Sequence, residues 1–207
     1  MRDFEDFLPH IMPFVPGCPE PTAIHWLRQA TIEFCERTRM WRCDDEFPVT
    51  PAECDVVCAP AGAQLLEIEH ATFNDFPIDP ASIDELDRDY PQWRSDTASC
   101  SQPSCFTQIA PDTVRVVPAA TGTLKLYTIL MPAQDGEQVP DWFYDKYAKL
   151  LAAGALKDIM MLPGEPFYNP QQAAVNSATF YSVLDTKAST RIRGQQRAAV
   201  RTRAQYL

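Results

Sequence analysis

The chain has 207 residues, of which 45% are hydrophobic and 22% are charged, enough for one folded domain with its own core. Nineteen prolines against seven glycines predict stiff, extended loops. The formal net charge of −10 argues against a broad nucleic-acid-binding surface, because most of such a surface would repel phosphates.

The start of the chain, Met1-Arg2-Asp3-Phe4-Glu5-Asp6, carries acids where a secretory leader carries basic residues. The sequence also lacks an apolar run of roughly 18 residues, so we expect no membrane span. Synthesis in a cytoplasm follows, and the seven cysteines are then expected to be reduced thiols.

Apolar spacing predicts helical segments in the first forty residues. Phe4, Phe7, Leu8 and Ile11 form the apolar side of a short helix or turn that prolines interrupt. A longer helix is predicted from about residue 21 to residue 40, since its apolar residues recur every three or four positions.

The middle of the chain changes to an alternating period, which predicts strands separated by proline and glycine turns. We expect an antiparallel meander in which residues 106–109, 113–117 and 123–130 pair and residues 65–73 join them. A short helix is predicted in residues 79–88, and residues 95–104 are expected to form an exposed polar loop. Two further short strands are expected at residues 46–50 and 54–58.

A helical hairpin is predicted after the strands. Its first helix follows Pro140, and its second helix has Asn169 as a candidate N-cap with Pro170 at the first helical position. Gly164, between two prolines, stops the first helix. Both helices carry an apolar stripe, so the hairpin is expected to be core.

We therefore predict an α+β fold that is mainly α: a helical bundle with an inserted antiparallel β meander and an extended C-terminal tail. Residues 1–186 form a single domain, with a helical core in residues 1–42 and 139–186 and a β insertion in residues 43–138. Residues 187–207 form a basic tail.

Charge is unevenly distributed along the chain. Residues 1–186 contain 28 acidic and 12 basic residues, a net charge of −16, whereas residues 187–207 contain six basic residues and no acid. Such asymmetry is typical of an interaction tail, which could bind an acidic protein surface or nucleic acid, or only solubilise the chain. Apolar residues in the tail favour a protein groove. The candidate docking residues are Lys187, Arg191, Arg193, Arg197, Arg201, Arg203, Tyr206 and Leu207.

Catalytic and metal-binding signatures are weak. Cys54 and Cys58, with Cys100 and Cys105, lack the tight spacing of zinc knuckles, and a strand would hold the first two about 13 Å apart. Phosphate-binding glycine motifs are absent. We predict no catalytic residue, no metal and no cofactor. A small cytoplasmic metal-binding protein or enzyme with a site built from His70 and the cysteines remains the alternative.

The order of these elements is similar to that of a known family, and the similarity is strongest in two segments: V-P-D-W-F-Y-D-K-Y-A-K-L-L-A-A-G-A-L-K-D-I-M and L-P-G-E-P-F-Y-N-P-Q-Q-A-A. It resembles the head-to-tail adaptor (connector) proteins of tailed bacteriophages, in which a proline opens a helix at "P-D-W" and a "P-x-Y-N-P"-like turn opens a helical hairpin. The likeness covers most of residues 20–193. The long segment 74–105 and the cysteines have no counterpart that we can match.

The resemblance implies a structural virion protein of the phage neck, without enzymatic activity. It implies a homo-oligomeric ring, a dodecamer, beneath the portal protein, with tail, tail-terminator or nozzle proteins on the other side. The basic tail would dock on the portal. Genomic DNA would pass through without sequence-specific binding, and an acidic channel would let it slide.

Overall fold

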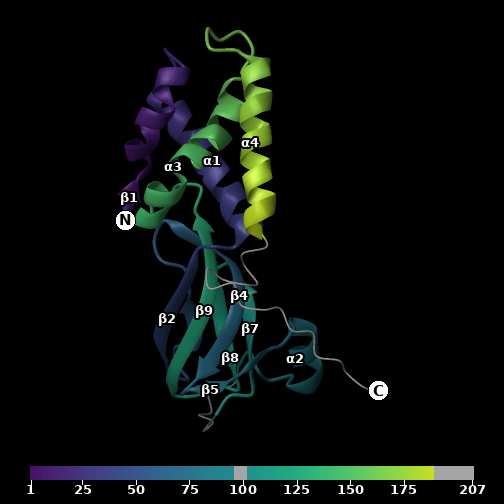
Figure 1. Cartoon of the computed structure of the whole chain (residues 1–207). Helices are drawn as coiled ribbons and strands as arrows, with labels where there is room; N and C mark the ends of the chain where they lie inside the picture. Colours follow the sequence, from purple (N-terminus) through teal and green to yellow (C-terminus); the bar gives the residue numbers. More distant parts are fainter. Residues whose placement is uncertain (96–101, 189–207) are drawn as a thin grey trace. The chain divides into compact units, whose positions relative to one another are not determined.

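The computed structural model describes residues 1–95 and 102–188 (Figure 1). This part of the chain forms two compact units. The helical unit comprises residues 1–40 and the described residues from 131 onward. The β unit comprises the described residues between 41 and 130.

Three long helices build the helical unit, together with two short 3-10 helices and a two-stranded ladder in which β1 pairs antiparallel with β10. Helices α1 and α4 both pack on α3, and η1 packs against α1 and α3 (Figure 1). The elements are β1 (Arg2–Asp3), η1 (Phe4–His10), η2 (Met12–Phe14), α1 (Glu20–Thr38), β10 (Gln138–Val139), α3 (Asp141–Ile159) and α4 (Pro170–Ala188).

The helix ends follow from local chemistry. Helix α1 stops because Arg39 takes a left-handed conformation with φ of 50°, and its N–H donates to the Cys35 carbonyl at 2.7 Å. The N-cap prediction for α4 is confirmed, since Asn169 Oδ1 accepts the Gln172 N–H at 3.1 Å. These ends fix where each helix presents its apolar stripe.

Aromatic rings fill the core of the helical unit. Phe34 of α1 contacts Phe143 of α3 with ring centroids 5.7 Å apart, and it contacts Tyr147 at 4.9 Å. The apolar side expected for residues 4–11 is confirmed, because all four of its residues are buried: Phe4, Phe7, Leu8 and Ile11.

Helix α4 meets the other two helices at Gly154 of α3. A Cβ added at Gly154 would lie 2.7 Å from Phe180 Cε2 and 2.9 Å from Ala30 Cβ, so only glycine permits this approach. Beside it, Lys157 Nζ lies 2.7 Å from Asp158 Oδ2 and 3.4 Å from Glu33 Oε2. One contact region therefore joins α1, α3 and α4.

The β unit contains two four-stranded sheets, with the strand orders β2-β9-β4-β5 and β3-β8-β7-β6 (Figure 1). A short helix, α2 (Ile83–Asp89), begins with a capping box between Ser82 and Glu85. The strands are β2 (Arg42–Val49), β3 (Asp55–Val57), β4 (Ala63–Phe73), β5 (Phe76–Pro77), β6 (Asp79–Pro80), β7 (Cys105–Ala110), β8 (Thr113–Val117) and β9 (Gly122–Pro132).

An apolar core contains buried residues of both sheets, which is the arrangement of a β-sandwich. The first sheet supplies Val49, Phe73, Leu124 and Leu126, and the second supplies Val56, Phe106, Val114 and Val116.

The prediction of a mainly helical bundle is wrong. The described part is about 40% helical and 31% strand, with three multi-stranded sheets. Strand content was underestimated because β2 begins at Arg42, in a charged segment without apolar alternation. It is nevertheless paired with β9 along its whole length, from Arg42 opposite Ile129 to Val49 opposite Gly122.

The predicted antiparallel meander is also corrected. Strands β7 and β8 form the expected antiparallel pair, but β9 leaves them and pairs with β2 and β4 in the other sheet. Residues 118–121 are therefore a crossing between sheets instead of a hairpin turn. The sequence does not reveal this, because both connections have the same turn-rich composition.

Gly154→Ala tests the close approach of the three helices. Alanine is the better helix former by about 1 kcal/mol, yet we expect a net loss of about 1–3 kcal/mol in the free energy of unfolding, since Phe180 or Ala30 must move. Urea unfolding of the full chain measures the change. Ala178→Ser, which adds one atom on the exposed side of α4, is the control and should stay within about 0.5 kcal/mol. A Gly154→Ala protein as stable as the unmodified chain contradicts the prediction.

Candidate interaction surfaces

The predicted docking tail lies almost entirely outside the described residues. Helix α4 carries the backbone through Lys187 to Ala188, two residues beyond the predicted boundary of the body. Docking by the tail therefore stays a prediction. The tail residues outside the description are Arg191, Arg193, Arg197, Arg201, Arg203, Tyr206 and Leu207.

Three of the described thiols are poor candidates for nucleophiles. Cys35 is fully buried, and burial raises its pKa far above the ordinary range. Burial also raises the pKa of Cys43 and of Cys58 to about 11 each. A thiolate nucleophile needs a lowered pKa, so none of these three environments activates sulfur.

The alternative of a Cys/His metal site gains no support from the geometry. In residues 1–95 and 102–188, no three His, Cys, Asp or Glu side chains gather closely enough to hold a metal ion. Cys58 Sγ instead donates to the Asp112 carbonyl at 3.1 Å, and the His70 ring contacts Tyr127. Cys100 lies outside the described residues.

The β unit carries most of the negative charge. Residues 41–130 contain 15 acidic and five basic residues, the same net charge of −10 as the whole chain. Each of the five basic side chains is already in an ion pair inside this unit, so ten carboxylates remain in excess of its cations. The pairs are Arg42–Glu69, Arg88–Asp89, Arg94–Asp87, Arg115–Asp55 and Lys125–Glu46.

Two of these pairs, Arg115–Asp55 and Arg94–Asp87, belong to a network that holds the segment after α2 onto its sheet. Two nitrogens of Arg115, on β8, donate hydrogen bonds to the Asp55 carboxylate. A third nitrogen, Nη1, donates to the Arg94 carbonyl at 3.3 Å. The Arg94 and Arg115 guanidinium groups lie over the Trp93 ring at 4.5 and 5.6 Å. Trp93 Nε1 donates to Asp87. The sequence alone does not predict these arginine contacts, because nothing local indicates which distant carboxylate each arginine meets.

An apolar groove of about 400 Å³ lies in the helical unit. Helix α3 forms its floor, and the 3-10 helices and the first turns of α4 form its walls. Sequence reasoning missed this groove, since its walls come from three separate segments. The lining residues are Pro9, His10, Phe14, Lys149, Ala152, Ala153, Leu156, Gln172 and Asn176.

The outer side of α4 is exposed and uncharged. No charged residue occurs between Pro170 and Leu184, and Val175 is 57% exposed. Hydroxyl groups on this side donate back to their own helix, as Thr179 does to the Val175 carbonyl at 2.9 Å and Ser182 to the Thr179 carbonyl at 3.0 Å. The surface therefore behaves as more apolar than its composition suggests.

These features describe a protein built for surface contacts, and comparison with known families agrees. The model of the SU10 adaptor protein family matches residues 6–205. The chain belongs to this family. The match spans nearly the whole chain, and it confirms the resemblance to phage head-to-tail adaptors. A search of curated proteins found no match.

Membership assigns the adaptor to the structural proteins of the bacteriophage virion, at the junction where portal and tail proteins associate. It does not favour the alternative of a metal-binding protein or enzyme. Among the described helices of the adaptor, none is long and apolar enough to cross a membrane.

Asp55→Asn tests the ion pair with Arg115. The hydrogen bonds and charge of Arg115 hold the pKa of Asp55 below its ordinary value, so the pair stabilises the fold above the unfolded pKa of about 3.9. That contribution is lost as pH falls through the lowered pKa. We expect Asp55→Asn to lose up to about 1 kcal/mol at pH 7, and the difference from the unmodified chain to be smaller at pH 3 than at pH 7.

Urea unfolding at both pH values measures this difference. Glu53→Gln is the matched control, because it removes an exposed carboxylate that forms no ion pair in the described structure. A loss in Asp55→Asn that is equally large at both pH values would show that the charge of Asp55 is not responsible.

Proposed function

We propose that the adaptor assembles into a closed homo-oligomeric ring, a dodecamer, beneath the portal and joins the capsid vertex to the tail. The observation that carries this proposal is the family match over residues 6–205. In this role residues 1–186 act as one adaptor domain, with residues 187–207 as its docking tail. The protein works by assembly and performs no catalysis.

The outer side of α4 supports lateral contact between copies in such a ring. Residues 170–184 include no charged side chain, so a neighbouring copy can cover this side of α4 without burying an unpaired charge. Its small side chains, Ala174, Ala178 and Ser182, permit close approach of a second surface. Ring closure needs two different patches on each copy, and α4 offers one of them.

The charge of the β unit supports a passage for DNA. Its acidic residues outnumber its basic residues by ten, so the unit would repel phosphates and give DNA no place to bind. Genomic DNA would therefore slide past without sequence-specific contacts. Basic side chains lining the channel of an assembled ring would contradict this part of the proposal.

The basic tail supports docking on the portal. Its cations, from Lys187 to Arg203, are separated from the acidic body along the sequence, and Tyr206 and Leu207 add apolar anchors. Arginine forks favour a partner surface rich in carboxylates. The distal face of the ring would meet tail, tail-terminator or nozzle proteins.

Binding to the portal tests the proposal. The full chain and a chain that ends at Thr186 are each mixed with the portal, and the complexes are analysed by sedimentation and electron microscopy. We expect the full chain to add a second ring and the shortened chain to add none. Failure of the full chain to bind would overturn the adaptor ring.

A third variant separates the effect of the tail's charge on portal binding from the effect of its length. In it, Arg191, Arg193 and Arg197 are replaced by Gln, which keeps the tail but removes three cations. We expect portal binding that is weaker than that of the full chain and less sensitive to salt, because fewer ion pairs remain to be screened. Thermal unfolding of the chain ending at Thr186 is the control. A large loss of its stability would show that the tail belongs to the folded body and would argue against a docking role.

A further inference from the structure

The groove of the helical unit has a chemistry that differs from the rest of this acidic chain. None of its nine lining residues is acidic, although the chain contains 28 acidic residues. Lys149, the first of its α3 residues, is exposed and forms no ion pair within the described residues, whereas Lys157 of the same helix is paired twice. The groove therefore favours a partner surface that is uncharged along most of its length and carries a carboxylate at one end.

The exposed side of α4 has this pattern. Val175, Ala178 and Ser182 are exposed and follow one another at intervals of three and four residues, so they form a ridge along one side of the helix. The ridge ends at Asp185, the first charged residue after Pro170. The Asp185 side chain is 75% exposed, and Arg37, its ion-pair partner, lies 4.0 Å away. The carboxylate is therefore open to a second cation.

The ridge and the groove face different directions on one copy. At about 100° per residue, the ridge lies roughly 120° round α4 from Gln172 and Asn176, which line the groove. When the ridge of one copy enters the groove of a second, each copy still has one of the two surfaces free. Contacts of this kind continue from copy to copy and form a ring when the rotation closes.

The close approach of α3 and α4 shows which of their residues lie level. Gly154 of α3 meets Phe180 of α4. Later along α3, Met160 meets Asn176, which precedes Phe180, so the two helices run antiparallel. Because both helices rise by the same distance per residue, positions that are equally far from the contact of Gly154 with Phe180, in opposite directions along the chain, are level.

The ridge and the α3 side of the groove are in register. Asp185 follows Phe180 of this contact by as many residues as Lys149 precedes its Gly154, and Ala178 and Leu156 are matched in the same way. A neighbour related by rotation about an axis parallel to these helices, without a shift along the axis, presents its ridge at the same levels. The neighbour's Asp185 is then level with Lys149, and the neighbour's Ala178 is level with Leu156.

We propose that the ridge on α4 of one copy packs into the groove of the next copy, and that Asp185 pairs with Lys149 across each interface. The inference rests on the proposed ring and names the two surfaces that close it. Burial of the ridge leaves its hydroxyl satisfied, since Ser182 donates to the Thr179 carbonyl of its own helix at 3.0 Å. The α4 helices of all copies then run parallel to the ring axis.

Charge reversal tests the ion pair. Lys149→Glu brings two carboxylates together and Asp185→Lys brings two amines together, so we expect each variant to need at least about tenfold more protein to assemble. The protein with both changes restores opposite charges and should assemble within about threefold of the unmodified chain. Sedimentation of the full chains over a range of concentrations measures assembly. A double variant that assembles no better than the single variants overturns the proposal.

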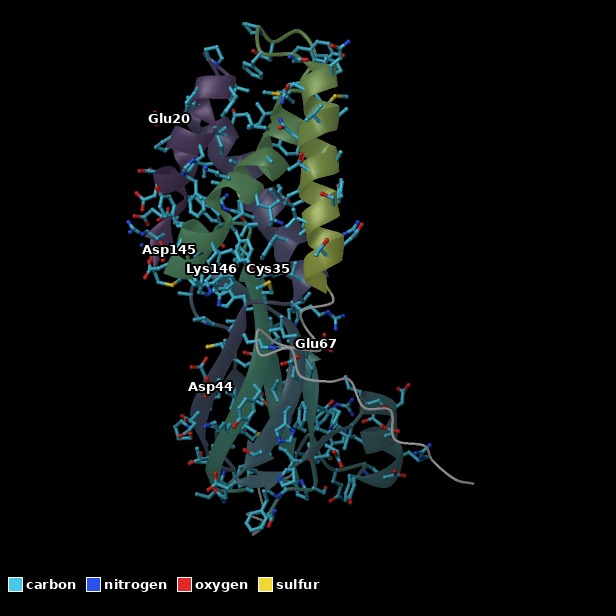
Figure 2. The ribbon with its side chains drawn as sticks, in the orientation of Figure 1. Glu20, Cys35, Asp44, Glu67, Asp145 and Lys146 are labelled. Atoms are coloured by element: carbon cyan, nitrogen blue, oxygen red, sulfur yellow. The ribbon has the colours of Figure 1, made fainter. Side chains whose placement is uncertain are left out.

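Lys146→Glu is the control for the change in net charge. Lys146, labelled in Figure 2, is an exposed residue of the same helix that does not line the groove. We expect its replacement to leave assembly within about threefold of the unmodified chain. Loss of assembly as large as that of Lys149→Glu would show that net charge is responsible, and it would overturn the proposed pair.

Cross-linking identifies the surfaces that meet. One protein carries Ala153→Cys in the groove, and a second carries Ser182→Cys on the ridge. We expect a mild oxidant to link the two proteins when they are mixed, and to link neither alone beyond the level of the unmodified chain, whose seven cysteines set the background. Linkage of the ridge protein to itself shows a two-fold contact between α4 helices and overturns the proposal, as does a mixture without linkage.

The same variants separate this inference from the proposed function. Linkage is measured without the portal and then with it. Links between ridge and groove in copies that add no ring to the portal contradict the proposed function alone. A ring on the portal whose copies form no such links contradicts this inference alone.

Discussion

The helical unit depends on how closely α4 can approach α3. Among its described side chains, α4 buries only Ala173, Phe180 and Leu184, which is little for a helix of this length. The contact of Phe180 with Gly154 therefore accounts for much of its attachment. Lys157 strengthens the same region, since the hydrogen bond and charge of Asp158 and the charge of Glu33 raise its pKa although burial alone would lower it. Helix α4 can then leave a whole side uncovered and still be held.

The sequence predicted most elements of the fold because their signals are local. Proline and asparagine mark the start of α4, and the apolar period identifies α1 and α3. Asn74 and Asp75 both have positive φ between β4 and β5, as a tight hairpin requires, and asparagine and aspartate are residue types that favour turns. Each of these features needs only a few neighbouring residues to form.

The arrangement of strands could not be predicted in the same way. The partners of β9, β2 and β4, are some eighty and sixty residues away along the chain, and the connection from β8 looks like any other turn. The strand β2 is also hard to recognise from the sequence, since Asp44 (labelled in Figure 2) and Glu46 are exposed. Both carboxylates pair with Lys125 across the sheet. Cross-strand pairing makes a charged segment stable as a strand, and only the register shows which charges meet.

The candidate surfaces also divide into features that the sequence reveals and features that appear only in the folded chain. Composition reveals that the middle of the chain is acidic, but the pairing of Arg42, Arg94 and Arg115 decides which carboxylates are left over. The groove combines residues from the first, middle and last parts of the helical unit, so it exists only after folding. The tail is the opposite case: its charge and its anchors are read from the sequence, and its docking remains a prediction.

The first and last residues of the β unit lie close together, and this closeness affects how such proteins can diversify. The Leu130 N–H donates to the Trp41 carbonyl at 2.8 Å, so the chain leaves and returns through neighbouring strands. Ninety residues are thus inserted between two points that a short loop could also join. Deletion, enlargement or exchange of this insertion would leave the path of the flanking helices unchanged. The insertion can accordingly evolve at its own pace, as an interchangeable module, while the helices keep their partners.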